Sequence, residues 1–309
     1  MTPAIALHDL AKHYGPVRAL DGVSLDVPSG SVFGFLGPNG AGKTTTLRIL
    51  TGLARPSSGS ARVLGHDVVT SPHAVRSAVG YLPDVPGFYP WMTGAELLGF
   101  AGRLFGLSGR VLRTRVDAIL NLAGLAGVKT RVGGYSRGMK QRLGVAQALI
   151  NAPSVLMLDE PTSALDPIGR KAVLDMIASL AGRTTVFFST HILSDVERVC
   201  DTVAILHRGK VAAQARIGDL KSRYGMQKIA VEATPSAEPL AAALAHAPWV
   251  SAVERPSDDR VVLAVNDVQR AQREIPAAAV AQGVGIRRLE TVEVSLEDVF
   301  VDLVGEGGR

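Results

Sequence analysis

The sequence has little cysteine and no long apolar run, and each absence excludes a class of protein. A single cysteine, Cys200, cannot form an intrachain disulfide and fits a reduced compartment. Nowhere do 18 consecutive apolar residues occur, so we expect that the chain does not span a bilayer. The first ten residues include His8 and Asp9 and lack the apolar core of a signal peptide, so none is predicted.

Charge is divided unevenly along the 309 residues, a length that allows about two domains. Residues 1–225 contain 25 Lys and Arg against 15 Asp and Glu, whereas residues 226–309 contain 8 against 13. A net charge of +5 would suggest a nucleic-acid partner if it were spread over one patch. Because it is divided unevenly, no such partner is expected. Part of the basic surface would face phosphates or acidic lipid headgroups, and a solvated arginine-rich surface is the alternative for most of it.

A glycine-rich segment follows the apolar run Val32–Leu36, which is predicted to be a buried strand. The segment contains the pattern G-x-x-x-x-G-K-[ST] and consists of Gly37, Pro38, Asn39, Gly40, Ala41, Gly42, Lys43, Thr44 and Thr45. Its glycines permit positive φ, so that successive N–H groups form an anion nest where a helix begins near Lys43. Lys43 would reach the β- and γ-phosphates of a nucleotide, and the Thr44 hydroxyl would bind Mg²⁺. The alternative is a glycine-rich turn that matches by chance.

A second apolar run, residues 155–158, leads into the carboxylates Asp159 and Glu160. Open α/β sheets bind ligands at the carboxyl ends of their strands, so we expect both side chains at a binding site. Asp159 would hold Mg²⁺ through water, and Glu160 would polarise the water that attacks a phosphoanhydride. Such a pair alone would more often be a solvated turn, but the phosphate loop upstream favours the catalytic interpretation.

A third motif lies between the first two. Ser136 occupies the N-cap position of a segment with helical apolar spacing, and Gly138 follows it, which makes a second anion site. In this order the motifs resemble those of the ATP-binding subunits of ABC transporters, in which this site closes on nucleotide held by a partner copy. The family's pentapeptide usually reads L-S-G-G-Q. Ser136 and Gly138 match it, whereas Tyr135, Arg137 and Met139 depart from it.

Other positions match the family in the expected order. Residues 161–166 resemble the D-loop, which in that family communicates between the two nucleotide sites. His191 follows the β-rich run 185–189 and resembles the switch histidine that contacts the γ-phosphate, with a satisfied loop or core histidine as the alternative. Tyr14 resembles the aromatic residue that stacks on adenine, with a surface tyrosine as the alternative.

Asp84 stands where the family places a glutamine that touches Mg²⁺ and contacts the permease. Aspartate is shorter by one methylene, carries a negative charge and cannot donate through an amide. The resemblance makes Asp84 a candidate metal contact, and the alternative is a side chain that points away and serves as a hinge or permease contact. An apolar cluster follows, either as core or as part of a groove for a permease helix. It consists of Phe88, Tyr89, Trp91 and Met92.

Two domains are predicted. Residues 1–216 would form an α/β P-loop NTPase with a RecA-like core and a helical subdomain at roughly 85–150, including helices at 95–105 and 111–123. Residues 217–309 would form a small α+β domain with the element order β-α-β-β-α-β of a ferredoxin-like unit. Its elements are expected at 228–233, 239–247, 250–254, 260–266, 268–282 and 286–294.

A capped helix is expected to end the second domain, because Ser295 begins an S-x-x-D box. This ending resembles the C-terminal extension of ATPases that drive ABC-2 type exporters of drugs, polysaccharides or lipids. The resemblance implies ATP and Mg²⁺ as cofactors, a nucleotide-sandwich homodimer, and an integral-membrane permease of the ABC-2 type as partner. The chain would act as an ATPase at the cytoplasmic face of the membrane, as a peripheral subunit that drives export.

The competing hypothesis is a soluble ABC-type ATPase that acts as a mechanical switch on a ribosome or nucleic-acid complex. Such relatives usually fuse two ATPase units or insert a long coiled coil. Only 93 positions separate Lys43 from Ser136, which leaves no room for that insertion.

Overall fold

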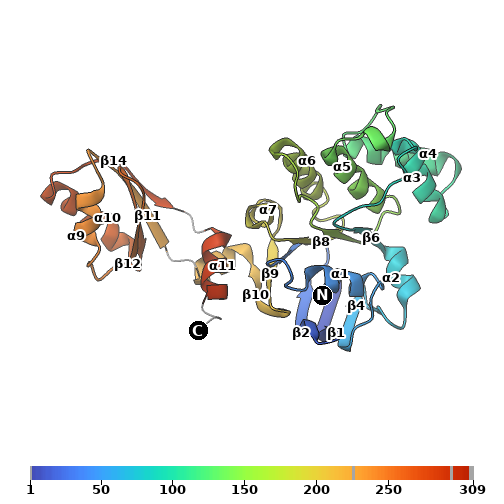
Figure 1. The fold of residues 1–309 in the computed structure, drawn as a ribbon, viewed down its shortest axis with the longest axis horizontal. Coiled ribbons are helices and arrows are strands. Elements are labelled where there is room, and N and C mark those ends of the chain that lie inside the picture. The colour runs from blue at the N-terminus through green and yellow to red at the C-terminus, as the bar shows by residue number, and fades with distance from the viewer. Residues whose placement is uncertain (1, 225–226, 293–294, 306–309) are drawn as a thin grey trace. The chain divides into compact units, whose positions relative to one another are not determined.

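The computed structural model describes residues 2–224, 227–292 and 295–305. The chain forms two compact units, Met1–Ile217 and Gly218–Arg309, each with its own hydrophobic core (Figure 1). Among the described residues, no helix combines the length and the apolar character needed to cross a bilayer.

A six-stranded sheet forms the centre of the first unit. Its strands, in spatial order, are β10 (Lys210–Arg216), β9 (Thr202–His207), β3 (Val32–Leu36), β8 (Thr185–Thr190), β7 (Val155–Asp159) and β6 (Val79–Leu82). The strands from β9 to β6 are parallel, and β10 runs antiparallel to β9. β3, β7 and β8 are buried throughout, as expected for apolar strands covered on both faces. Because parallel strands end at the same edge, the segments that follow these three strands meet there.

An antiparallel sheet packs beside the central one. Its strands, in spatial order, are β2 (Val17–Val27), β1 (Ile5–Tyr14), β4 (Ser58–Val63) and β5 (His66–Asp67). Helix α1 (Lys43–Leu50) contacts strands of both sheets. Side chains of the two sheets and of α1, such as Leu7, Phe35 and Leu47, form one core. This packing fixes the start of α1 against the ends of the central strands.

The other helices of this unit are α2 (Pro72–Ala78), α3 (Gly94–Leu104), α4 (Gly109–Leu122), α5 (Arg137–Ala148), α6 (Pro167–Ala178) and α7 (Leu193–Val199). Figure 1 shows α5 and α6 on the side of the central sheet opposite to α1. The helix expected at 95–105 begins one residue earlier, because a capping box sets its start. The Thr93 hydroxyl accepts from the Glu96 N–H at 3.3 Å, and the Glu96 carboxylate accepts from the Thr93 N–H at 2.8 Å.

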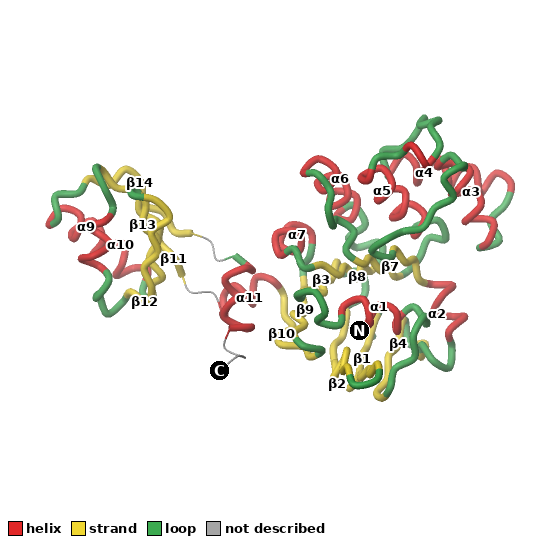
Figure 2. Tube along the Cα trace, viewed as in Figure 1, coloured by secondary structure: helices red, strands yellow, loops and turns green. Residues whose placement is uncertain are grey.

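The second unit contains a four-stranded antiparallel sheet with the order β12-β13-β11-β14. Its elements are α8 (Ile217–Tyr224, which spans the boundary between the units), β11 (Gln227–Thr234), α9 (Glu238–Leu244), β12 (Val250–Ser257), β13 (Arg260–Val265), α10 (Val268–Ala281), β14 (Gly285–Val292) and α11 (Leu296–Gly305). Figure 2 shows α9 and α10 on one side of this sheet, where Trp249 and Ile275 belong to a shared core. The predicted β-α-β-β-α-β order, and with it the fold class, is confirmed.

Two details of this unit bear on the sequence interpretation. The last two residues of the strand expected at 286–294 lie outside the described residues. The predicted cap of the final helix is present, because the Ser295 hydroxyl accepts from the Asp298 N–H at 3.2 Å. Asp298 also binds Lys228 of β11 at 2.8 Å, which ties the start of α11 to the sheet.

Candidate functional site

The phosphate loop connects β3 to α1. Gly40 and Gly42 have φ angles of +79° and +112°, which glycine adopts without strain. A side chain at Gly42 would also collide with the Ala19 carbonyl oxygen. Among the described residues, no side chain caps α1. The first N–H groups of the helix are therefore left to bind an anion.

Lys43 is surrounded by oxygen atoms inside this loop. Its Nζ donates to the carbonyl oxygens of Gly37 at 2.7 Å and Pro38 at 3.3 Å. It also lies 3.1 Å from Glu160 Oε1, and both side chains of this ion pair are buried. Buried charges attract each other strongly, so the pair restrains both residues.

Glu160 connects Lys43 to His191. Its second carboxylate oxygen, Oε2, lies 2.9 Å from His191 Nδ1. Glu160 has a φ of +48°, a strained value for a residue other than glycine, and its N–H donates to the Ser189 carbonyl oxygen at 2.9 Å. Such strain persists only where the surroundings enforce it, and it is concentrated at functional sites.

Asp159 ends β7 and is almost completely buried. Burial raises its pKa above the ordinary value, the hydroxyls of Ser189 and Thr44 oppose this increase, and the charges of Glu160 and Asp84 add to it. The Ser189 hydroxyl donates to Asp159 Oδ1 at 2.6 Å. Oδ2 is also buried and has no hydrogen-bond partner among the described residues. Buried carboxylate oxygens normally have partners, so this one is suited to a cation or a bound water.

A metal ion at this position would need ligands from the nucleotide. Within residues 2–224, 227–292 and 295–305, no group of three or more His, Cys, Asp and Glu side chains is arranged to hold a metal. Mg²⁺ usually takes only one or two protein carboxylates when phosphates supply other oxygens. The Thr44 hydroxyl and Asp159 therefore fit an ion shared with a nucleotide.

A cavity of about 260 Å³ lies over the phosphate loop. Most of its lining residues are among those selected from the sequence, namely Pro38, Asn39, Gly40, Gly42, Lys43, Thr44, Thr45, Asp84 and Glu160. Asp84 therefore lines the same cavity as the phosphate loop. Sequence reasoning missed Val17, Arg18 and Ala19, which also line it. The only signal was their position directly after the turn that follows Tyr14.

Tyr14 itself does not line that cavity. Its ring is about half exposed, and the Lys12 ammonium group lies 4.8 Å from the ring centroid. It pairs across the hairpin with Val17, which does line the cavity. Contact between Tyr14 and adenine therefore stays a prediction.

Ser136 and Gly138 lie away from the phosphate-loop cavity, at the start of α5. Ser136 is the N-cap, and its hydroxyl accepts from the Met139 N–H at 3.2 Å. Gly138 faces α6, where a side chain added to it would contact Gly169. The predicted helix start at Ser136 is thus present, whereas anion binding there stays a prediction, and neither Ser136 nor Gly138 lines the phosphate-loop cavity.

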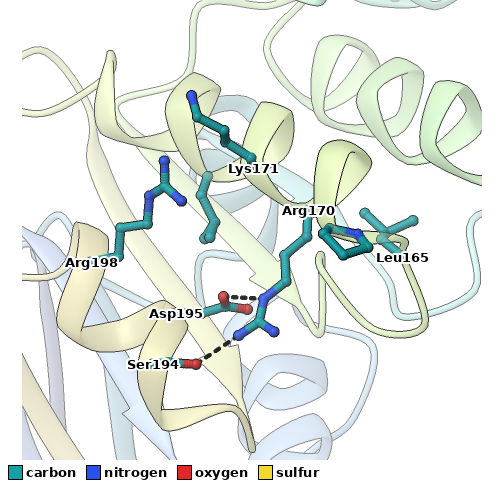
Figure 3. A pocket seen from close by; sticks show the side chains of 8 residues that line it. Leu165, Arg170, Lys171, Ser194, Asp195 and Arg198 are labelled. Carbon is teal, nitrogen blue, oxygen red and sulfur yellow. Dashed lines mark hydrogen bonds and ion pairs between the residues drawn. The ribbon is translucent and has the colours of Figure 1, made fainter. Parts of the chain in front are cut away.

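A cluster around the buried Asp195, which sequence reasoning missed, joins the segments on either side of the site, and Figure 3 shows its Asp195 and Arg170. Asp195 of α7 accepts from the Thr162 hydroxyl and from Arg170 Nε, each at 2.5 Å. Arg170 also donates to the Ser194 hydroxyl at 2.8 Å. Thr162 lies two residues after Glu160, and Asp195 lies four residues after His191. We call Thr162, Asp195 and Arg170 the clasp.

The clasp borders a second cavity of about 330 Å³ between α6 and α7 (Figure 3). Arg170, Lys171 and Arg198 all line it, but each already has a carboxylate partner. The sequence offered a weak signal for the clasp, because one acidic residue follows His191 at a spacing of one helical turn. A buried carboxylate that accepts two bonds fixes the relative position of the segments it joins.

The parallel sheet of the first unit and the phosphate loop between β3 and α1 together are those of a P-loop ATPase. A family model described as ABC transporter matches residues 20–163, and one described as ATP-binding protein DrrA1-3-like, C-terminal domain, matches residues 216–304. The ABC transporter ATP-binding protein YxlF of Bacillus subtilis is 41% identical, over 97% of this chain and 99% of its own. The bacitracin transport ATP-binding protein BcrA of Bacillus licheniformis is 36% identical over 99% of both chains.

The daunorubicin/doxorubicin resistance ATP-binding protein DrrA of Streptomyces peucetius is 36% identical, over 98% of this chain and 93% of its own. A solved structure of an ATP binding subunit of an ABC transporter matches with a TM-score of 0.65 and 30% identity, over 72% of this chain and 93% of its own. This chain belongs to the family of ABC transporter ATP-binding proteins. It is therefore an ATP-binding and ATP-hydrolysing subunit of the ABC transporter family. These relatives favour transport over the alternative of a switch on a ribosome or nucleic-acid complex.

Proposed function

We propose that this chain powers export through a separate ABC-2 type permease, by hydrolysing MgATP between two copies of itself at the cytoplasmic face of a membrane. The observation that carries this proposal is the chain of contacts from Lys43 through Glu160 to His191 beside the phosphate-loop cavity. These contacts bring a cation, a carboxylate and an imidazole together beside that cavity, and phosphoryl transfer uses groups of these kinds, which supports the proposal.

Glu160 is the general base in this proposal. Attack of water on the γ-phosphate requires a group that removes a proton and a cation that stabilises the phosphate charge. Phosphates entering the loop would compete with Glu160 for the Lys43 ammonium group. Oε1 would then be available to the attacking water, while His191 holds Oε2 and contacts the γ-phosphate.

Thr44 and Asp159 would hold Mg²⁺ against the phosphates. The buried Oδ2 of Asp159, which has no hydrogen-bond partner in the described part of the chain, supports this assignment. Bound Mg²⁺ would supply positive charge to the phosphate oxygens as the bond to the leaving group breaks. Asp84 is a third candidate contact, because it lines the same cavity and its charge influences Asp159.

Ser136 and Gly138 would complete the site from the second copy. Each copy carries one phosphate loop and one separate anion-binding helix end, so two copies facing each other would enclose two nucleotides. Closure around nucleotide would then move the attached membrane subunits, and hydrolysis would reset them.

A cavity of about 370 Å³ next to the nucleotide site is the proposed docking position for the permease. Its lining residues are Asp84, Val85, Pro86, Phe88, Arg137, Lys140 and Gln141. Asp84 lines both this cavity and the phosphate-loop cavity, so a partner bound here would be coupled to the nucleotide. Of the apolar cluster, Phe88 lines the cavity, whereas Tyr89 and Trp91 are exposed. The names of the relatives support antibiotics as the exported class.

The test is co-purification with the membrane protein encoded by the neighbouring reading frame, followed by reconstitution in proteoliposomes. ATP-dependent movement of an antibiotic from the side that carries this chain is expected. Val85→Ser should weaken co-purification, because this exposed valine lines the docking cavity. Val69→Ser, at an exposed valine elsewhere, is the matched control. Equal co-purification of both variants would contradict the docking position, and failure of the wild type to associate with that permease would contradict the proposed partner.

A further inference from the structure

An apolar ridge, exposed except for the half-buried Phe100, includes residues of α3 and of the segment that precedes it. The ring of Trp91 lies 5.3 Å from that of Tyr89, and the ring of Tyr89 lies 5.8 Å from that of Phe100 in α3. Leu104 follows Phe100 by four residues, so both lie on one face of the helix. Trp91 and Leu104 are 60% and 72% exposed. We call Trp91, Tyr89, Phe100 and Leu104 the α3 ridge.

Three positively charged arginines lie near the α3 ridge in the sequence, at the end of α3 and the start of α4. Arg103 lies beside Leu104, and Arg110 and Arg113 lie in the first turns of α4, on either side of Val111, which is 62% exposed. All three arginines are exposed, and no ion pair to them is found within the described part of the chain. No acidic residue occurs between Glu96 and Asp117.

Two other exposed arginines of the first unit have carboxylate partners. Arg198 binds Asp175 at 2.9 Å, and Arg18 approaches Asp21 at 3.8 Å. The α3–α4 turn therefore combines exposed apolar side chains with uncompensated positive charge. Phe105, at the C-cap of α3, adds a further half-exposed ring.

We propose that the α3 ridge and its flanking arginines bind the surface of a bilayer that contains anionic lipid. Arginine and apolar side chains on one surface are the pattern of interfacial helices, in which the apolar groups enter the headgroup region and the cations face lipid phosphates. Trp and Tyr are enriched at that depth because their rings are apolar and their tips are polar. Anionic headgroups would supply the counter-charges that these arginines lack among the described residues.

The position of the ridge agrees with a membrane contact. Tyr89 directly follows Phe88, which lines the cavity assigned to the permease, so the ridge continues outward from that docking position. This inference rests on the peripheral membrane location proposed above. It adds a lipid contact to the protein contact, and it does not depend on the assignment of the catalytic residues.

Sedimentation with vesicles tests the proposal, using the purified full chain without permease. The chain should bind vesicles of phosphatidylcholine with phosphatidylglycerol, bind pure phosphatidylcholine vesicles much less, and dissociate as salt is raised. Trp fluorescence supplies a second measurement. The chain has two tryptophans, and Trp249 is already buried, so a blue shift on binding reports Trp91. Trp91→Phe should remove that shift.

Two variants that remove the same charge at different places distinguish binding by this surface from nonspecific attraction between a basic protein and anionic lipid. Arg110→Gln with Arg113→Gln should weaken binding roughly 25-fold, since each arginine near an anionic surface contributes about fivefold. Arg55→Gln with Arg183→Gln removes the same charge at exposed positions elsewhere and should change binding less than threefold. Leu104→Ser with Phe105→Ser should weaken the binding that remains at high salt.

Equal losses in the two double-arginine variants would overturn the proposal, as would a fluorescence spectrum that does not change on binding. Absence of binding to anionic vesicles, with association only when the permease is present, would assign the ridge to a protein partner instead. ATP hydrolysis by each variant in vesicle-free solution should equal that of the wild type. A failure of lipid binding is thereby distinguished from a failure of the ATPase assignment.

Discussion

Lys43 Nζ lies 3.1 Å from Glu160 Oε1 in a buried ion pair, so the residue assigned to phosphate binding restrains the residue assigned as the base. The other carboxylate oxygen is held by His191 at 2.9 Å. Phosphates that attract Lys43 must compete with Glu160. In the proposed mechanism, nucleotide binding and release of the base are therefore one event, and Glu160 is unavailable to activate water until a nucleotide is bound.

His191→Ala should lower kcat by about 100-fold and change ATP affinity by less than about threefold. The imidazole contacts the base directly, and correctly positioned acid–base groups contribute roughly 10²–10⁴ in rate. Steady-state phosphate release and ATP titration measure the two quantities. His73→Ala, at an exposed histidine of α2, is the control and should behave as wild type. A loss of affinity that matches the loss of kcat/KM would assign His191 to ground-state binding.

The pH dependence of Mg²⁺ binding should reveal the environment of Asp159. Burial, together with the charges of Glu160 and Asp84, raises the pKa of this carboxyl. Mg²⁺ binds the ionised form, so its affinity for the ATP complex should fall as pH decreases through the raised pKa. The fall should begin at a higher pH than for an ordinary aspartate.

Asp84→Asn should shift the decrease in Mg²⁺ affinity to lower pH, because it removes one of the charges that raise the pKa of Asp159. It should also increase ATP binding in EDTA, whereas Asp84→Gln restores the amide usual in the family and should retain substantial hydrolysis. Titration of ATP with Mg²⁺ and with EDTA measures both effects. Identical ratios of affinity in wild type and Asp84→Asn would remove Asp84 from the metal site and leave a coupling role.

The clasp should set the position of His191 relative to Glu160. Thr162→Val keeps the shape of the side chain and removes the hydroxyl that Asp195 accepts, so kcat should fall about fivefold to tenfold at little change in KM for ATP. Thr162→Ser restores the hydroxyl and should restore most of kcat.

Thr185→Val is the control for the clasp, since it removes another buried hydroxyl from β8, the strand that leads to His191. Both valine variants should lose about 1–2 kcal/mol of unfolding free energy in urea titrations. Only Thr162→Val should lose turnover. If Thr162→Val and Thr185→Val had equal kcat, the clasp would contribute to stability but not to turnover.

Deletion of the residues after 225 should leave ATP affinity within about threefold of the intact chain. The first unit has its own core and contains the phosphate-loop cavity, whereas no residue of the second unit lines that cavity among the described residues. Dimerisation or coupling to the permease should weaken. Calorimetry on the folded truncation checks this, and a collapse of ATP affinity would contradict the division of roles.

Local patterns in the sequence were sufficient to predict the elements that form the site. The glycines of the phosphate loop, the apolar run before Asp159 and Glu160, and the N-cap at Ser136 each act within a few residues, so they can be read directly. Asp84 was found only because of the family resemblance. Its approach to Asp159 depends on β6 pairing with β7, which no local pattern specifies.

Contacts between distant segments could not be predicted in this way. Asp195 and Thr162 are 33 residues apart, and their hydrogen bond exists only once α7 is placed beside the loop that follows β7. Arg18 reaches the phosphate-loop cavity through the pairing of β1 with β2. Tyr14, chosen from the same hairpin, pairs with Val17 but does not itself line the cavity.

Size-exclusion chromatography of Glu160→Gln with MgATP tests the central claim most directly. The amide keeps the size of the side chain but cannot act as the base, so ATP should bind without turnover and a dimer that retains ATP should accumulate. Adding Lys43→Ala should abolish that dimer, because the phosphates lose their cation. Elution of Glu160→Gln as an unchanged monomer, together with phosphate release at the wild-type rate, would contradict both the base and the sandwich.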